Sequence, residues 1–216
     1  MYSILVSLDG TTGNCDLEDY PAPYDRVAAV TYNNGEVLAC GGQDLVDADR
    51  CWRLDGSAWS SLPNSNQKHC VWDSPNVPVN DGWWVTGQLQ DKDYSCFSSP
   101  TSEVYTGTAW IPGPALPEDE YIQWSCVINL DTTHTLLIGG GYPVRRDVWL
   151  YDWSSQAWTR TGSLIHGREN HACVGLGDLG ILAVGGYDVH TVELYDPSQG
   201  TWSSQPDLPA DISPLF

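Results

Sequence analysis

The sequence is poor in basic residues, with nine Lys and Arg against 28 Asp and Glu, and its formal net charge is −19. Phosphate backbones and anionic membranes are bound through concentrated basic surfaces. The only adjacent basic pair is Arg145–Arg146. We therefore expect no nucleic-acid partner and no anionic membrane surface. No EF-hand spacing gives the acidic surplus a calcium-binding role, so we interpret the charge as a solubility feature.

Long apolar runs and targeting signals are also missing. No stretch approaches the length of a transmembrane helix, so we expect no membrane insertion. The segment Met1–Ser7 lacks the basic start and long apolar run of a signal peptide, and no N-x-[ST] glycosylation site occurs. If the protein is secreted, we expect its leader upstream of this sequence.

Catalytic and metal-binding motifs are absent as well. There is no C-x-x-C pair, no H-E-x-x-H and no G-x-S-x-G, which excludes zinc ribbons, zincin proteases and α/β-hydrolase sites. The five histidines are scattered, and His69 and His171 fall at similar places in the repeat described below, which indicates packing. We expect no catalytic residue, no cofactor and no metal.

Aromatic residues and turn formers are abundant instead. Eleven Trp and eleven Tyr stand against two Phe, and 21 Gly and 14 Pro are spread along the chain. Hydrophobic residues make up 41% and charged residues 17%, so the chain can bury a core. This composition favours a sheet protein with many short turns.

A tryptophan preceded by a short turn recurs every 44 to 51 residues. Upstream of it, an apolar run ends in a glycine doublet, and a Leu-Tyr-Asp type phrase lies between the two landmarks. The second copy of the doublet is degraded to Gly87–Gln88. The tryptophans are Trp59, Trp110, Trp158 and Trp202, and the doublets are Gly41–Gly42, Gly139–Gly140 and Gly185–Gly186.

Each repeat contains four short apolar segments, which we interpret as four antiparallel strands. Four such strands at this period form one blade of a β-propeller. We therefore predict an all-β chain with a single propeller domain over residues 1–216. Its blades would span about 25–63, 69–117, 124–163 and 170–209, with 1–24 as a partial blade or closing strand.

The repeat resembles the kelch repeat over about residues 25–210. The fourth copy matches best, with Arg168–Cys173, Ile181–Gly186, Leu194–Pro197 and then Trp202. The resemblance implies a kelch-type propeller. Kelch domains commonly have more than four blades, so the ring could continue in another chain or in further sequence, and open blades could self-associate.

The landmark residues have structural explanations. The doublet glycines are expected to end the second strand of each blade, where the chain turns tightly and neighbouring blades crowd together. The tryptophans are expected to fill the gap between adjacent blades. Burying one such ring contributes roughly 4–6 kcal/mol as an upper estimate.

Seven cysteines suggest an oxidising compartment, so we expect an extracellular protein, with a cytoplasmic one as the alternative. Cys40 and Cys51 are predicted to form a cross-strand disulfide in the first blade. Cys96 could reach Cys15 or Cys70. Three cysteines, Cys70, Cys126 and Cys173, share one first-strand position near the propeller axis, where they would line a channel metal site or, as we prefer, serve as small apolar residues.

The loops between second and third strands vary while the strands repeat, and variable loops on a fixed scaffold usually carry recognition. The loop Gly141–Arg146 adds the only local positive charge. We therefore predict a non-catalytic binding module whose candidate binding residues are Tyr142, Arg145, Arg146, Tyr187 and His190. Its partner would be a protein or a glycan, such as an acidic peptide or a sulfated sugar.

Three other functions remain open. Kelch resemblance also fits an intracellular adaptor or actin-binding scaffold. Open blades would suit a structural subunit of a larger assembly. A metal-dependent enzyme on the propeller axis is the third alternative.

Overall fold

The computed structural model describes residues 19–21, 27–32, 35–41, 48–69, 76–79, 82–89, 96–117, 124–141 and 143–209. Within these ranges the chain forms four separate sheets, each built from four consecutive strands. The first two sheets are β1 (Ala28–Tyr32), β2 (Glu36–Cys40), β3 (Cys51–Asp55), β4 (Ala58–Ser61) and β5 (Asn76–Val79), β6 (Gly82–Leu89), β7 (Cys96–Tyr105), β8 (Trp110–Pro112). The other two are β9 (Cys126–Asn129), β10 (His134–Ile138), β11 (Val148–Asp152), β12 (Ala157–Arg160) and β13 (Ala172–Gly175), β14 (Ile181–Val184), β15 (Val192–Asp196), β16 (Thr201–Gln205).

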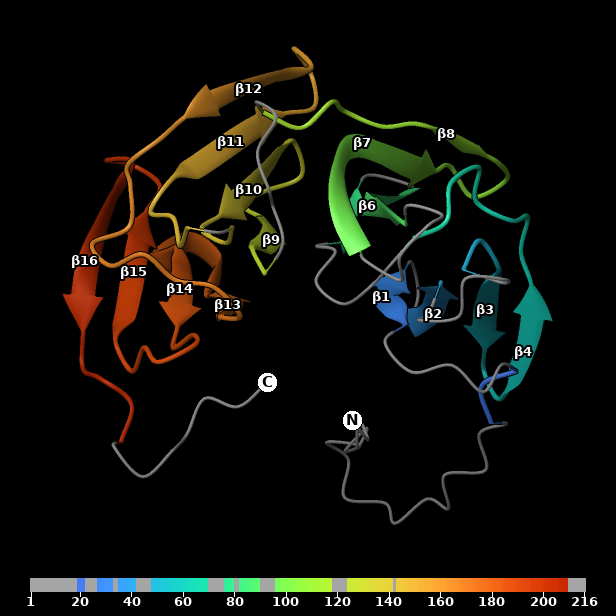
Figure 1. Cartoon of the computed structure of the whole chain (residues 1–216), viewed down its shortest axis with the longest axis horizontal. Coiled ribbons are helices and arrows are strands. Elements are labelled where there is room, and N and C mark those ends of the chain that lie inside the picture. Colours follow the sequence, from blue (N-terminus) through green and yellow to red (C-terminus); the bar gives the residue numbers. More distant parts are fainter. Residues whose placement is uncertain are drawn as a thin grey trace.

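The sheets are arranged as the blades of a propeller (Figure 1). The first strands β1, β5, β9 and β13 lie innermost, and β5 packs against both β1 and β9 while β13 packs against β9. The fourth strands lie outermost. The predicted all-β propeller is therefore confirmed, and the 3₁₀ turn at Gly177–Leu179 is a short element outside the sheets.

The four blades follow one another around an open arc in Figure 1, with the described strands of the first and fourth blades at its two ends. Residues 1–18, the main part of the predicted partial blade, lie outside the described residues, as do 210–216. The partial blade or closing strand over residues 1–24 therefore stays a prediction. No helix in the part of the chain described here is long and apolar enough to cross a bilayer.

Glycine doublets end the second strand in three of the blades. Gly41, Gly139 and Gly185 follow β2, β10 and β14 with φ of 75°, 59° and 64°, a left-handed backbone that suits residues without a Cβ. The second blade has no doublet, and there β6 runs on through Gly87 and pairs with β7 beyond a register shift between Thr86 and Gln88. Gly42 lies outside the described residues.

The repeated tryptophans join adjacent blades. The indole N–H groups of Trp110, Trp158 and Trp202 donate to the carbonyls of Pro63, Ala115 and Gly162, at 3.0, 2.8 and 2.9 Å. Each acceptor follows the fourth strand of the preceding blade. Each of these rings also lies beside a cross-strand tyrosine of its own blade, with centroids 4.8–5.2 Å apart. Trp59 of the first blade lies 5.1 Å from Tyr20.

The contact between the third and fourth blades is close enough to require a glycine. Gly162 N donates to the carbonyl of Gly200 over 3.0 Å, and a Cβ on Gly162 would lie 2.1 Å from that same oxygen. The Tyr195 hydroxyl reaches Thr161 Oγ1 at 2.7 Å in the same seam. Any side chain at position 162 would push the two blades apart.

A buried carboxylate on the third strand holds the segment that connects one blade to the next. Glu193 on β15 is fully buried and accepts hydrogen bonds from the backbone N–H groups of Ile165 and His166, at 2.6 and 3.0 Å. The buried Arg168 guanidinium contacts the same carboxylate at 2.5 Å and also donates to the carbonyls of Gly185 and Thr191. This cluster fixes the segment 164–168 on the fourth blade.

The second blade repeats this arrangement with different side chains. Glu103 on β7 accepts from the backbone N–H of Gln67 and the side chain of Asn66, and it contacts His69 Nε2 at 3.1 Å. His69 thus takes the part that Arg168, not His171, takes in the fourth blade. His69 and His171 therefore have different roles although they occupy similar positions in the repeat.

Both carboxylates stay ionised because of these bonds. Burial alone would raise the pKa of Glu193, but the N–H groups of Ile165 and His166 and the Arg168 guanidinium lower it below the usual 4.5. Burial likewise opposes ionisation of Glu103, and His69, Asn66 and Gln67 lower its pKa overall.

We predict that Trp202→Ala lowers the melting temperature by roughly 6–20 °C, because truncating a buried Trp costs about 3–5 kcal/mol in a chain of this size. Trp202, 9% exposed, closes the seam between the third and fourth blades. Trp202→Phe keeps most of the ring and should fall in between. Leu179→Ala, at a site that is 73% exposed, is the control. An unchanged melting temperature for Trp202→Ala would show that the ring does not hold the blades together.

We predict that Glu193→Gln destabilises the chain by roughly 3–5 kcal/mol at neutral pH, because Arg168 would stay buried without its counter-charge. The pKa of Glu193 is lower in the folded than in the unfolded chain, so its contribution is present above about pH 4.5 and disappears as the pH falls through the folded-state pKa. Melting curves of both chains between pH 7 and pH 3 should converge at the acid end. Asp178→Asn, in an exposed turn, is the control, and a gap that widens in acid would contradict the assignment.

Candidate binding face

Three segments of the third and fourth blades meet on one face of the propeller. They are the loop 143–147 between β10 and β11, the connector 164–170 between β12 and β13, and the loop 187–190 between β14 and β15. Arg168 N donates to the carbonyl of Arg145 at 3.2 Å, and Tyr187 N donates to the carbonyl of Glu169 at 2.9 Å. We call these three segments the connector face.

The connector face exposes three large apolar side chains, one from each segment. Val144, Ile165 and Tyr187 are 45%, 37% and 62% exposed. Gly167 packs below them, since a Cβ at this position would lie 3.3 Å from Val144 Cγ1. Exposed apolar side chains that are grouped on one face indicate a recognition surface, whereas scattered ones are ordinary.

Charged groups border these apolar side chains. The Arg146 side chain is exposed, and its Nε donates to the carbonyl of Leu164 at 2.6 Å, which directs it along the connector. The exposed His166 has Nδ1 3.5 Å from a Glu193 oxygen. Asp188 is exposed at the far end, so the face is mixed in charge and not simply positive.

The five binding residues predicted from the sequence differ in their accessibility. Arg146 and Tyr187 are exposed, whereas Arg145 and His190 are half-buried, and Tyr142 lies outside the described residues. Sequence reasoning missed Val144, Ile165 and His166. The signal for Val144 was an apolar residue inside a turn-rich loop. The signal for Ile165 and His166 was their position just before Gly167 and Arg168, where the best-matching repeat begins.

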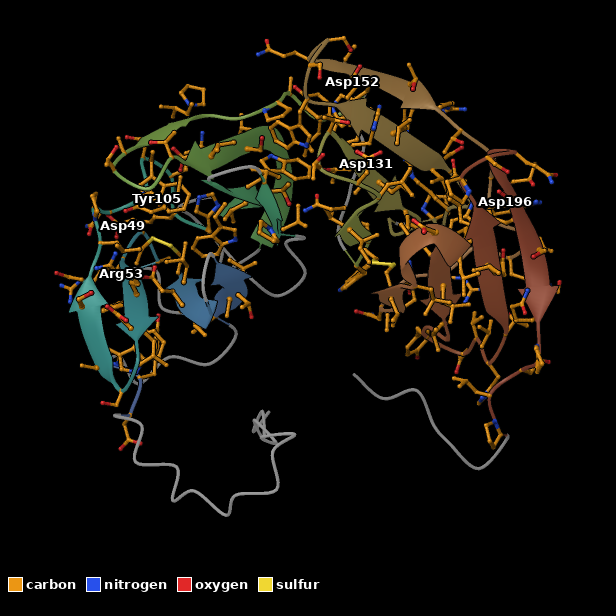
Figure 2. All side chains as sticks on the ribbon, turned by 180° about the vertical axis from the view of Figure 1, so that it is seen from behind. Asp49, Arg53, Tyr105, Asp131, Asp152 and Asp196 are labelled. Atoms are coloured by element: carbon orange, nitrogen blue, oxygen red, sulfur yellow. A yellow bond between two sulfur atoms is a disulfide. The ribbon has the colours of Figure 1, made fainter. Side chains whose placement is uncertain are left out.

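Two disulfides are present among the described residues (Figure 2). Cys40 and Cys51, the predicted pair, are directly opposed on β2 and β3 and are bonded. Cys126 and Cys173 form a second disulfide between the innermost strands of the third and fourth blades. Our preferred interpretation of these two as small apolar residues did not include this bond. Cys15 and Cys70 lie outside the described residues, and so does the side chain of Cys96.

His171 lies beside the second disulfide. One of its ring nitrogens and the two sulfur atoms of Cys126 and Cys173 all lie within 4.8 Å of one another. The side chain is nine-tenths buried, and neither ring nitrogen has a hydrogen-bond partner in the described part of the chain. Burial, followed by the charge of Arg168, lowers the pKa of His171 to about 3, so the imidazole is neutral.

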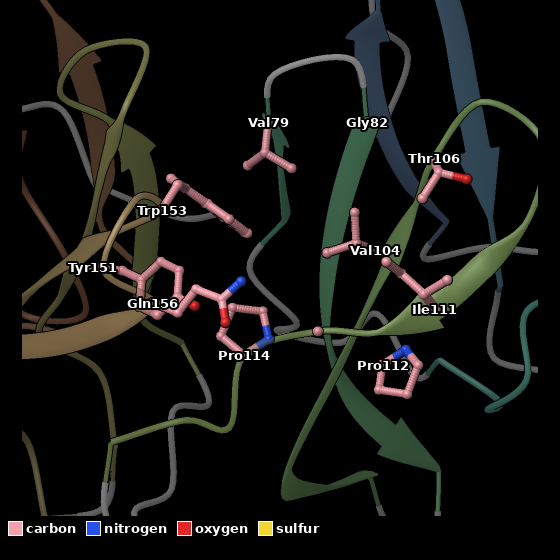
Figure 3. Close-up of a pocket in the computed structure, with 11 residues that line it drawn as sticks. Val79, Gly82, Val104, Thr106, Ile111, Pro112, Pro114, Tyr151, Trp153 and Gln156 are labelled. Atoms are coloured by element: carbon pink, nitrogen blue, oxygen red, sulfur yellow. The ribbon is translucent and has the colours of Figure 1, made fainter.

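A groove on the opposite face separates the second and third blades (Figure 3). Its volume is about 470 Å³, and its walls include Val104, Ile111 and Pro114 from the second blade and Tyr151, Trp153 and Gln156 from the third. These residues lie near the turns between third and fourth strands, where the sequence predicted no recognition. The mainly apolar walls suit an apolar side chain rather than a charged ligand.

Comparisons with known proteins agree with the repeat. The family model for the Kelch motif matches residues 168–209. Kelch-like protein 35 of Mus musculus is 34% identical over 110 residues, which are 48% of this chain and 18% of that protein. Kelch-like protein 24 of Rattus norvegicus is 36% identical over 109 residues, 46% of this chain and 17% of its own length. The match thus spans less than a fifth of these curated relatives.

A solved structure described as "Structure of YjhT" superposes with a TM-score of 0.70, covering 90% of this chain and 69% of that chain. At 13% identity this similarity concerns the fold alone. The repeat period, the four consecutive four-stranded blades and the matched motif lead to one assignment. The chain contains a Kelch motif at residues 168–209, is similar to kelch-like proteins over about half of its length, and folds as a kelch-type β-propeller.

Proposed function

We propose that this chain is a non-catalytic protein-binding module that contacts its partner through the connector face. The observation that carries the proposal is the exposure of Val144, Ile165 and Tyr187 on three segments held together by backbone hydrogen bonds. Kelch-like proteins 35 and 24, to which the chain is similar, support a protein partner.

The partner segment is expected to be apolar, with an acidic side chain at one end. The three exposed apolar side chains would cover an apolar segment, and Arg146 would form a charge-assisted hydrogen bond with a carboxylate. Asp188 and the overall acidity of the chain would disfavour a uniformly acidic partner. This is more restrictive than the acidic peptide or sulfated sugar suggested by the arginine pair alone.

We further propose an oxidising compartment as the site of action. Two disulfides among the described residues support this localisation, because such bonds persist mainly outside the reducing cytosol. In the cytoplasmic alternative, both pairs would be thiols and the chain would act as an adaptor.

We predict that peptides selected on the wild-type chain from a random display library bind mainly through the connector face. Tyr187→Ala and Arg146→Glu should each weaken the selected peptides by about tenfold or more, because exposed aromatic and arginine side chains dominate such interfaces. Leu179→Ala, which removes a more exposed apolar side chain from the β13–β14 turn, is the matched control. Dissociation constants measured by titration calorimetry decide the comparison.

Two results would overturn this proposal. Selected peptides could bind the Tyr187→Ala/Arg146→Glu double variant as tightly as the wild type, which would place recognition elsewhere. Alternatively, a glycan array could yield ligands whose affinity depends on these two residues, which would make the partner a carbohydrate.

We predict that no more than three of the seven cysteines of the native protein, purified from its source, react with an alkylating agent under denaturing, non-reducing conditions. Intact mass gives the number, and peptide mapping should find Cys40, Cys51, Cys126 and Cys173 unmodified. Seven alkylated cysteines would contradict the oxidising compartment and favour the intracellular adaptor. The binding variants above test the connector face independently of this result.

A further inference from the structure

Cys126, Cys173 and His171 form a cluster of three side chains that could each bind a metal ion, and the disulfide involves only the two cysteines. Two sulfur atoms and an imidazole lie within 4.8 Å of one another. The imidazole is nine-tenths buried without a hydrogen-bond partner among the described residues, although buried polar groups are normally satisfied. Two soft sulfur donors and one imidazole are the ligands that Zn²⁺ takes in proteins.

We propose that in a reducing setting, such as the cytoplasmic alternative, where the Cys126–Cys173 disulfide is reduced, Cys126, Cys173 and His171 form a Zn²⁺ site that links the third and fourth blades.

The donor spacing is close to what the ion needs. In a tetrahedral site with Zn–S near 2.3 Å and Zn–N near 2.0 Å, donor atoms lie about 3.5–3.8 Å apart. The three side chains are already within 4.8 Å, so small side-chain rotations after the S–S bond breaks are sufficient. Cys126 and Cys173 are only half-buried on the innermost strands, so water can supply the fourth ligand.

The surrounding packing holds the imidazole in place. Gly139 of the third blade lies against the ring, since a Cβ there would be 3.2 Å from His171 Cε1. Gly186 of the fourth blade lies against the base of the same side chain, at 3.6 Å from His171 Cβ. The ring is therefore held between two glycine doublets, and its position is preorganised for a ligand role.

The local charge also fits a dithiolate complex of Zn²⁺. Arg168 is the nearby cation, but its guanidinium is paired with Glu193 at 2.5 Å, so the pair adds no net charge. Two thiolates neutralise a divalent ion, and the resulting neutral complex is the form that a largely buried site tolerates best.

The chemistry balances with a thiol as the reductant. Two thiol molecules give two electrons and two protons to the S–S bond, which breaks into the Cys126 and Cys173 thiols, while the reductant becomes its own disulfide. Zn²⁺ then displaces both thiol protons, and a neutral nitrogen of His171 donates its lone pair to the ion. The two blades are thus cross-linked on the axis side in either redox state.

The test uses the full chain, reduced with a phosphine under anaerobic conditions, freed of reductant and dialysed against Zn²⁺ alone. Elemental analysis should show one equivalent of Zn²⁺ fewer in Cys126→Ser/Cys173→Ser than in the wild type. Cys40→Ser/Cys51→Ser, which removes the other cysteine pair, is the matched control and should retain that equivalent. Equal zinc content in the wild type and Cys126→Ser/Cys173→Ser would overturn the proposal.

X-ray absorption at the zinc edge identifies the ligands directly. In the Cys40→Ser/Cys51→Ser chain we expect two sulfur atoms near 2.3 Å and a nitrogen near 2.0 Å. Adding His171→Ala should remove the imidazole signal. A sulfur-only shell, or an imidazole signal that survives His171→Ala, would overturn the proposal. If His171→Ala does not fold, the spectrum of the histidine-containing chain decides alone.

Discussion

A four-stranded blade cannot bury both of its faces alone, so each blade of this propeller depends on its contact with the next. The indole of the outer-strand tryptophan fixes that contact, because it packs on a tyrosine of its own blade and donates to a carbonyl of the preceding one. The donor always belongs to one blade and the acceptor to the preceding blade, so this hydrogen bond specifies which two blades are neighbours as well as joining them. At the seam between the third and fourth blades the approach is so close that Gly162 cannot carry a side chain.

The connectors between blades need a second constraint, and a buried acid provides it. Glu193 binds two backbone N–H groups and a guanidinium, so the connector after the third blade cannot move away from the fourth. Glu103 does the same for the connector after the first blade. The equivalent third-strand position is occupied by Trp52 in the first blade and by Trp149 in the third. An aromatic ring and a fully bonded carboxylate are two ways to fill the same site.

Much of the fold was readable from the sequence because two landmarks share one period. The spacing of the glycine doublets and the tryptophans specified four blades, and the second-strand and third-strand positions of Cys40 and Cys51 indicated a direct pair. Glu193 was not readable, because one buried acid among 28 carries no local sign of its partners. Its pairing with Arg168 depends on the position at which the connector 164–170 passes β15. That position is defined only by the packing of the third blade against the fourth.

The second disulfide could also have been predicted from the repeat. Cys126 and Cys173 are 47 residues apart, close to one repeat, and both were assigned to first strands. Equivalent positions on adjacent first strands approach each other near the axis, so the period itself contained the signal. The candidate binding residues were harder to predict. The repeat shows which loops vary between blades, but it does not show which side chains of a loop are exposed. Arg145 and Arg146 are neighbours in sequence, yet the first is half-buried and the second exposed.

The seam between the third and fourth blades is thus fixed at both of its ends. On the axis side the sulfur pair of Cys126 and Cys173 joins β9 to β13, and on the outer side Trp202 joins the fourth blade to Gly162. Two separated links prevent the blades from hinging against each other. The connector face spans this same seam, so the spacing of its apolar side chains is set before a partner arrives. Preorganisation of this kind lowers the ordering cost of binding, which supports our proposal that this small patch acts as a recognition surface.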